Sequence, residues 1–424
     1  MKRLVLALLG LMAGSTVAPE PAQQETISWS ALAQQAQSLN IPSPRLDFAA
    51  VLQQRGTAED HAVALKRLQR VQAQANTFVP QSWCEARAWD DLVFRLETQQ
   101  LRYQLMQSAA QQSPVAAYAG RVHALPQGAL WYRYLTRWWL GAEVSADALY
   151  AMGEQTFTEA IAALRQTAKV DNQPMIDSRQ DIAIQAQLRA SAARVEQNLD
   201  RLFHPMPGVS QPAFARSPLG PEFSAPGHYG NNTIYYNPLQ DAFDLAQLDW
   251  LYIHEGIPGH HLQQQMRRLH PLCPDVSSSS PQMAFIEGWA AYTETLGHDM
   301  GWYRDQASQA YALRWASLRA MRVMIDVGIH ARGWTDAEAR QHWQRHFPEG
   351  ADVMEREIQR IKRWPMQVIT YVYGMNQIKH SLSKQAARPD FDLRTFHHQL
   401  LGLSHFPLQA LTHLDSYQPE AHHE

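Results

Sequence analysis

The sequence is short of cysteine, of positive charge and of long apolar runs, and each shortage excludes a class of protein. Its 424 residues include two cysteines, Cys84 and Cys273, without a Cys-x-x-Cys spacing, so a cysteine-bound metal site is not expected. The net charge is −3 and no basic stripe appears, which argues against a nucleic-acid partner. The apolar run at residues 4–13 is shorter than the ~20 residues of a membrane-spanning helix, so a membrane-spanning protein is not expected.

The first residues of the chain have the pattern of a secretory signal peptide. Lys2 and Arg3 are basic, an apolar run follows at 4–13, and small residues lead to Ala18. This order predicts a signal peptide at 1–18 and export to the periplasm or the medium, whereas the alternative is a buried N-terminal helix. Export would permit Cys84 and Cys273 to pair, but two unrelated buried thiols are an equal alternative.

The patterning of residues 19–424 predicts one large, mainly α fold. Apolar residues recur at three- and four-residue steps up to about residue 202, as in amphipathic helices. Prolines then mark irregular structure, and the β-branched and aromatic run Thr233–Tyr236 predicts a strand. The spacing typical of helices returns from Ala242. We expect a helical part to about residue 204 and a catalytic part over about 205–424, with a small β element before the motif helix.

A later segment carries a helix-start signal. Thr335 stands three residues before Glu338, at the positions of a capping box. The pair predicts that a helix begins immediately after Thr335.

The segment His254–His261, with the sequence HEGIPGHH, has the residue types of a zinc hydrolase. In His-Glu-x-x-His enzymes, two histidines bind the metal and the intervening glutamate activates a water molecule. Apolar residues such as Ile253 and Leu262 flank the segment and indicate burial, where polar side chains need partners. The alternative is a helix–turn–helix with surface histidines.

The spacing of these histidines departs from the usual four residues. On a regular helix, at about 100° per residue, His260 would point away from His254, and His261 would return to the same face about 10 Å along the axis. Pro258 and Gly259 permit a bulge that brings one of the two histidines into the place of the second ligand. We favour His260 over His261.

A helical stretch further along the chain offers the third ligand. It contains Glu287 and Glu294, which are seven residues apart and share one face. Two carboxylates on the inward face of an apolar helix are costly unless a cation neutralises them. We expect Glu287 to bind the metal and Glu294 to orient a ligand histidine. The alternative is that both carboxylates are solvated.

Together these residues resemble a known family, the bacterial proteins grouped as domain of unknown function 885, which is related to thermolysin-like (gluzincin) metallopeptidases. The resemblance covers the C-terminal half well and rests on HEGIPGHHLQ at 254–263, EGWAAYTE at 287–294, DVGIHARGWT at 326–335 and WPMQVITYVYG at 364–374. One departure is that Met366 and Val368 stand where the family segment has Gly and Ala, which bears on the shape of the cleft.

The resemblance implies a mostly helical fold like that of the gluzincin oligopeptidases. It also implies one zinc ion bound by His254, His260 and Glu287, with Glu255 as the catalytic base.

We therefore expect a zinc metallopeptidase in which Glu255 takes a proton from the attacking water and passes it to the leaving amine. A second donor should stabilise the oxyanion. The candidates, in order of preference, are Tyr371, Tyr373, and then His330 or Arg332. The strand Thr233–Tyr236 is expected to offer a free edge to an extended peptide substrate.

Two other functions stay open at this point. The same metal site would suit an amidase acting on cell-wall or other non-peptide amides. A closed site with four protein ligands would instead suit a non-catalytic helical binding protein.

Overall fold

The computed structural model of the chain describes residues 27–39, 47–53, 56–109, 118–167, 174–219, 225–239, 241–276 and 282–417. The expected signal peptide at 1–18 lies outside the described residues. Helices make up most of the described chain, so the expected mainly α fold is confirmed. Within the described ranges, no helix combines the length and the apolar character that crossing a membrane requires.

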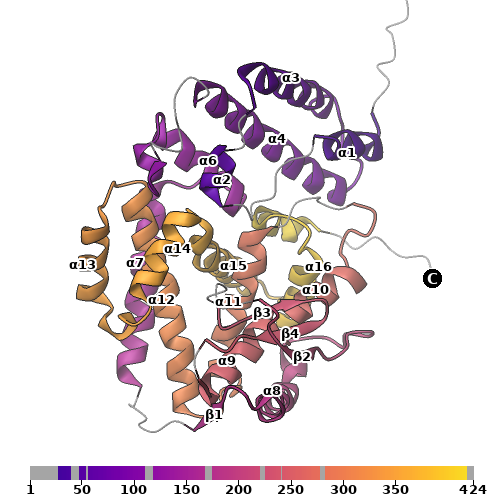
Figure 1. The fold of residues 1–424 in the computed structure, drawn as a ribbon. Coiled ribbons are helices and arrows are strands. Elements are labelled where there is room, and N and C mark those ends of the chain that lie inside the picture. The colour runs from indigo at the N-terminus through magenta and orange to yellow at the C-terminus, as the bar shows by residue number, and fades with distance from the viewer. Residues whose placement is uncertain are drawn as a thin grey trace, which may run out of the picture.

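Three helices form a layer of their own at the top of the molecule in Figure 1. They are α1 (Trp29–Gln37), α3 (Ala58–Ala75) and α4 (Trp83–Ala109). Their apolar faces pack together into a small core that includes Leu32, Leu68 and Leu96. This layer therefore has an interior separate from that of the larger body beneath it.

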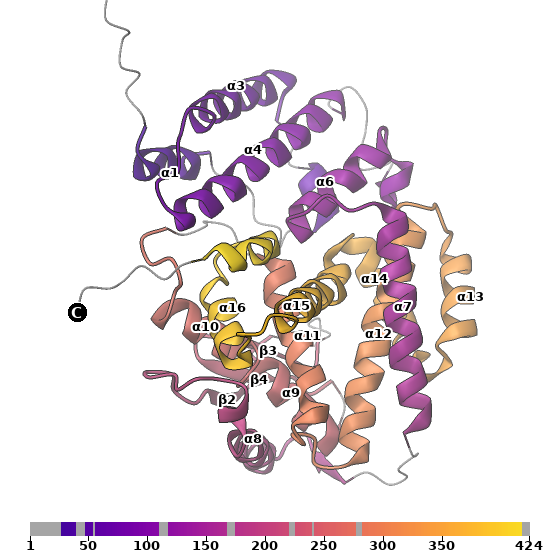
Figure 2. The same ribbon diagram turned by 180° about the vertical axis from the view of Figure 1, so that it is seen from behind.

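The larger body packs around one continuous hydrophobic core. Its earlier helices are α2 (Phe48–Gln53), α6 (Gly128–Leu140), α7 (Ala146–Gln166) and α8 (Asp181–Glu196). Its later helices are α9 (Leu245–Glu255), α10 (His260–Leu269), α11 (Met283–Asp299), α12 (Gln306–His330), α13 (Asp336–His346), α14 (Met354–Arg363), α15 (Thr370–Ala386) and α16 (Leu393–Gly402). Figure 2 shows α7 running alongside α12, so early and late helices share this core. The division near residue 204 stays a prediction.

Short 3-10 helices connect several of these elements. They are η1 (Val122–Ala124), η2 (Leu199–Arg201), η3 (Pro348–Gly350), η4 (Gln367–Ile369) and η5 (Leu408–Ser416). The expected capping box is present at the start of α13, where Thr335 and Glu338 each accept a backbone N–H from the other.

A three-stranded sheet lies directly before α9, as expected. Its order is β2 (Ala213–Arg216), β4 (Thr233–Tyr236) and β3 (Gly227–Gly230), with β4 parallel to β2 and antiparallel to β3. The two-residue turn at 231–232, where both asparagines have positive φ, joins β3 to β4 as a hairpin. A separate pair, β1 (Met175–Asp177) and β5 (Ala242–Asp244), leads into α9.

The expectation that Thr233–Tyr236 presents a free edge is wrong. This strand is the centre of its sheet and pairs on both sides, because β2 occupies the edge that the sequence left open. β3 is an edge strand instead, and it contacts α9.

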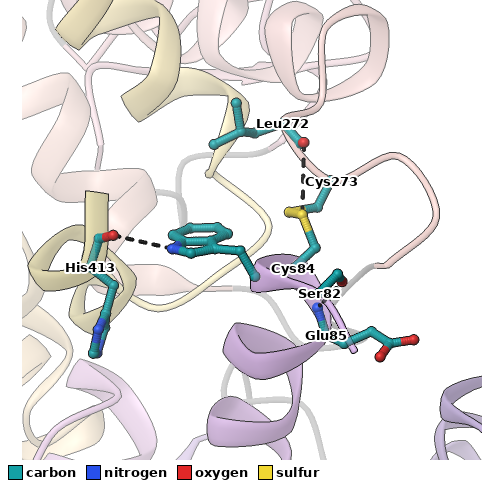
Figure 3. The surroundings of a disulfide bond; sticks show 7 residues. Ser82, Cys84, Glu85, Leu272, Cys273 and His413 are labelled. Carbon is teal, nitrogen blue, oxygen red and sulfur yellow. Dashed lines mark hydrogen bonds between the residues drawn. A yellow bond between two sulfur atoms is a disulfide. The ribbon is translucent and has the colours of Figure 1, made fainter. Parts of the chain in front are cut away.

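A disulfide bond joins Cys84, in the first turn of α4, to Cys273 in the segment after α10 (Figure 3). Next to it, the indole nitrogen of Trp83 donates a hydrogen bond to the carbonyl oxygen of His413 at 3.2 Å. The sequence left open whether Cys84 and Cys273 pair or are two unrelated buried thiols, and in the structure they pair. The bond ties the N-terminal layer to the larger body.

Candidate metal centre

The motif histidines come from two helices and not from one bulged helix. Helix α9 ends at Glu255 and α10 begins at His260, so the expected bulge within a single helix is wrong. The connection folds back on α9 so tightly that a Cβ on Gly259 would lie 1.9 Å from the carbonyl oxygen of His254. This turn sets the rings of His254 and His260 with their centroids 4.9 Å apart.

Glu287 completes a cluster of three potential ligands. A carboxylate oxygen of Glu287 lies 3.5 Å from Nε2 of His260. One potential ligand atom from each of His254, His260 and Glu287 lies within 4.8 Å of the other two. Two imidazoles and a carboxylate are a donor set typical of catalytic zinc sites. The residues present therefore fit the metal that the sequence predicts.

A close approach of two helices places Glu287. A Cβ on Gly288 in α11 would lie 2.4 Å from the Cα of Gly374 in α15, so the two backbones touch without intervening side chains. Glu287 precedes the first of these glycines, and Tyr371 lies one turn before the second. The contact therefore brings both side chains to the same cavity.

Glu294 and Arg319 support His254 from behind. Nδ1 of His254 donates to a carboxylate oxygen of Glu294 at 2.6 Å, and Arg319 donates to the other oxygen at 2.5 Å. Burial opposes ionisation of Glu294, but the charge of Arg319 and the hydrogen bond from His254 hold its pKa down at about 2. The ionised carboxylate keeps the hydrogen of His254 on Nδ1, so that Nε2 is left with a lone pair.

Glu255 lies beside the cluster with an unpaired oxygen. It is 6% exposed and lines the same cavity of about 320 Å³ as His254, His260 and Glu287. Its Oε2 is buried and has no hydrogen-bond partner among the residues that the structure describes. A buried carboxylate oxygen is costly without a partner, so this position suits a ligand, a water molecule or a cation.

Of the four candidate oxyanion donors, Tyr371 alone lines this cavity. Its ring centroid lies 6.4 Å from that of His254. Tyr373 is 6% exposed and packs in the hydrophobic core, two residues further along α15. The helix places the two tyrosines on different faces, and only the first faces the cluster.

His261 is held outside the cluster. Its Nε2 donates to the carbonyl oxygen of Ser210 at 2.6 Å, and its Nδ1 lies 3.2 Å from the hydroxyl oxygen of Tyr229. Both ring nitrogens therefore have partners outside the cluster, and the structure brings His260 to the cluster, as expected.

His330 and Arg332 also lie away from the cavity. His330 is buried at the end of α12, where it accepts from the backbone of Val122 at 3.3 Å and donates to the carbonyl of Ile361 at 3.0 Å. Burial lowers the pKa of His330 to about 3, so the ring is neutral. Arg332 pairs with Asp147 at 2.9 Å. Neither residue lines the cavity, so both were wrong as candidate oxyanion donors. The sequence does not show which side chains at the end of α12 and just after it reach the site.

The departure at 366 and 368 does not reach the cavity. Met366 and Val368 are fully buried in the core, whereas Gln367 between them lines the cavity wall. The side chains of Met366 and Val368 therefore point into the core and not into the cavity. The shape of the cleft is therefore set by other residues.

A group of arginines on the cavity wall was not predicted from the sequence. They are Arg319 and Arg322 in α12 and Arg356 and Arg360 in α14. A signal was present, because an Arg-x-x-Arg pair within the apolar centre of a long helix needs buried partners.

Comparisons with known proteins identify the family but no activity. No curated protein matches the chain. A "putative lipoprotein" from Colwellia psychrerythraea is 19% identical with a TM-score of 0.61, covering 90% of this chain and 71% of that one. A "putative lipoprotein of unknown function" from Shewanella oneidensis is 18% identical with a TM-score of 0.51, covering 85% and 73%. These likenesses establish the fold alone.

The relation to thermolysin-like peptidases is untested by these matches and stays a prediction. The family described as "Bacterial protein of unknown function (DUF885)" matches residues 28–414, and the chain therefore belongs to this family.

Proposed function

We propose that the protein is a zinc-dependent peptidase that cleaves peptide bonds in the cavity beside α9. The observation that carries the proposal is the convergence of His254, His260 and Glu287 within 4.8 Å, next to the unpaired carboxylate oxygen of Glu255. Zinc held by the first three residues would polarise a carbonyl group and acidify a water molecule.

The chain supplies the base and a hydrogen-bond donor. Glu255 accepts a proton from a water molecule in the cavity and delivers it to the leaving amine. The hydroxyl of Tyr371 donates a hydrogen bond to the oxyanion that forms during attack. Burial, aided by the charge of Glu287, raises the pKa of Tyr371, so its hydroxyl keeps its hydrogen at neutral pH.

Strand β3 offers a binding surface for an extended peptide. Gly227, His228 and Tyr229 line the cavity, and among the described residues β3 pairs with a strand on one side alone. A peptide pairing with the second edge would lie alongside the cluster, held by main-chain hydrogen bonds.

Export is part of the same proposal. The basic and apolar start of the chain and the disulfide between Cys84 and Cys273 both support an oxidising, extracytoplasmic location, either the periplasm or the medium. Fractionation of expressing cells, with thiol labelling of each fraction, tests this part.

The activity test uses purified, zinc-loaded protein and a mixed peptide library read by mass spectrometry. We expect cleavage products that vanish with a chelator and return with zinc. A parallel panel of non-peptide amides, including cell-wall fragments, tests the amidase alternative. Firmly bound metal without hydrolysis in either panel would favour the non-catalytic binding protein.

A further inference from the structure

The cavity wall formed by α12 and α14 carries more positive charge than its own acids neutralise. Figures 1 and 2 show α14 and β3 on either side of α11, and both elements contribute to the cavity lining. The arginines of this wall are Arg319, Arg322, Arg356 and Arg360. Arg319 forms an ion pair with Glu294, the carboxylate that supports His254.

Of the other three arginines, Arg322 and Arg356 share one carboxylate, that of Glu357. Glu357 lies 2.8 Å from Arg322 and 3.1 Å from Arg356. Arg360 donates to the side-chain amide oxygen of Gln367 at 2.9 Å and also hydrogen-bonds to Tyr371, and it forms no ion pair with a carboxylate of the described residues. The acids near the cluster would be offset by a divalent cation there, so the excess positive charge of the wall stays available to a ligand.

Two donors of this wall lack acceptors. Nη2 of Arg322, a residue 1% exposed, and Nε of Arg360 are buried and have no hydrogen-bond partner in the described parts of the chain. Leaving such charged donors unpaired is costly. A guanidinium presents parallel N–H groups that match the two oxygens of a carboxylate.

The wall lies close to the cluster. Arg322 and Arg360 line the same cavity as His254, His260 and Glu287. Tyr371 lines it too, and its ring lies 6.4 Å from the ring of His254. A group bound by the wall would therefore belong to a part of the substrate near the bond held at the cluster.

We infer that Arg360 and Arg322 bind a carboxylate of the substrate. The inference rests on the proposed peptidase function and deepens it by naming the substrate class. Such a carboxylate is either the C-terminus of the peptide, in which case cleavage releases a short C-terminal piece, or the side chain of an acidic residue near the cleaved bond. Both present the same chemistry to the arginines, and matched peptides distinguish them.

Binding to the zinc-loaded Glu255→Gln protein, measured by calorimetry, tests the inference without requiring hydrolysis. The probes are N-acetylated alanine-rich pentapeptides with a free or amidated C-terminus, and with Glu or Gln at an internal position. Acetylation removes the amino charge, so each pair differs by one carboxylate. We expect about tenfold or greater loss of affinity when the recognised carboxylate is neutralised.

Each outcome decides the question. Weaker binding of the amidated peptides identifies the C-terminal carboxylate as the ligand. Weaker binding of the Gln peptides identifies the side chain of an acidic residue. Equal affinity for all four peptides, or equally absent binding, overturns the inference. Hydrolysis by the wild-type protein without discrimination between the pairs leaves the peptidase proposal standing alone. Discrimination in binding without hydrolysis of any peptide leaves the carboxylate site standing alone.

Variants assign the effect to the wall. Arg360→Gln should remove most of the discrimination, and Arg360→Lys, which keeps the charge, should restore part of it. Arg363→Gln is the matched control, because Arg363 lies on the same helix but pairs with Asp47 at the surface, away from the cavity. Retained discrimination in Arg360→Gln, with the control unchanged, would show that the arginine wall is not the binding site.

Discussion

Nδ1 of His254 lies 2.6 Å from a carboxylate oxygen of Glu294, which stands two helical turns along α11 from Glu287. One helix therefore supplies both a member of the cluster and the group that orients another member. Arg319 completes the arrangement by keeping the supporting carboxylate ionised. The cluster depends on this second layer as much as on its three potential ligands.

Replacing Glu294 by Gln should lower the affinity for zinc by about 10- to 100-fold, because the amide no longer holds the tautomer of His254 as an ionised carboxylate does. Competition with a chromogenic chelator measures the affinity. Glu154→Gln, on the exposed face of α7, is the control and should leave it unchanged. Equal affinities in the two variants would contradict the supporting role.

Replacing Glu255 by Gln should leave zinc bound and reduce peptide hydrolysis by about 10²- to 10⁴-fold, because the amide cannot accept the water proton. Metal content by elemental analysis and initial rates with one cleaved peptide provide the two readouts. Activity within tenfold of the wild type would remove Glu255 from the mechanism.

The two neighbouring histidines should respond differently to alanine. His260→Ala removes a member of the cluster and should abolish stable zinc binding. His261→Ala should retain zinc but lower the free energy of unfolding by about 1–3 kcal/mol, since the carbonyl of Ser210 loses its donor. Zinc titration and denaturant unfolding separate the two effects. Zinc loss in His261→Ala alone would reverse the assignment.

Removing the disulfide should loosen the attachment of the N-terminal layer. The bond between Cys84 and Cys273 spans 189 residues of sequence, and replacing both cysteines by serine should lower stability by about 2–5 kcal/mol. Calorimetric melting measures the loss. Zinc affinity should be unchanged, because neither cysteine lines the cavity; a parallel fall in zinc affinity would mean that the bond also shapes the site.

Asp326 should make stability depend on pH. Burial raises its pKa from 3.8 to about 8, so between these values the folded protein holds a proton that the unfolded chain releases. The contribution is therefore complete below about pH 4 and is lost as the pH rises toward 8, at about 1.4 kcal/mol per pH unit. Asp326→Asn keeps an acceptor for the N–H of Met366, which Asp326 binds at 2.7 Å, and should abolish that slope. If the free energy of unfolding had the same pH dependence in the wild type and in Asp326→Asn, the prediction would be contradicted.

Several features followed from local sequence alone. The apolar spacing predicted the helices, the Thr335 and Glu338 pair predicted the start of α13, and the β-branched run predicted strand β4. Each depends on hydrogen bonds and side-chain contacts between residues close together in the chain, and those are readable from composition and period. The residue types of the candidate centre were likewise evident from the chain itself.

The tertiary structure alone decided how these parts meet. It placed His260 and not His261 beside His254, because Gly259 lets the chain fold back on the end of α9. It made β4 the central strand by pairing it with β2 as well as β3, so that β3 lies at an edge, and it turned His330 into the core. It also gathered the arginines of α12 and α14 on one wall. Such pairings depend on packing between distant segments, which local periodicity does not encode.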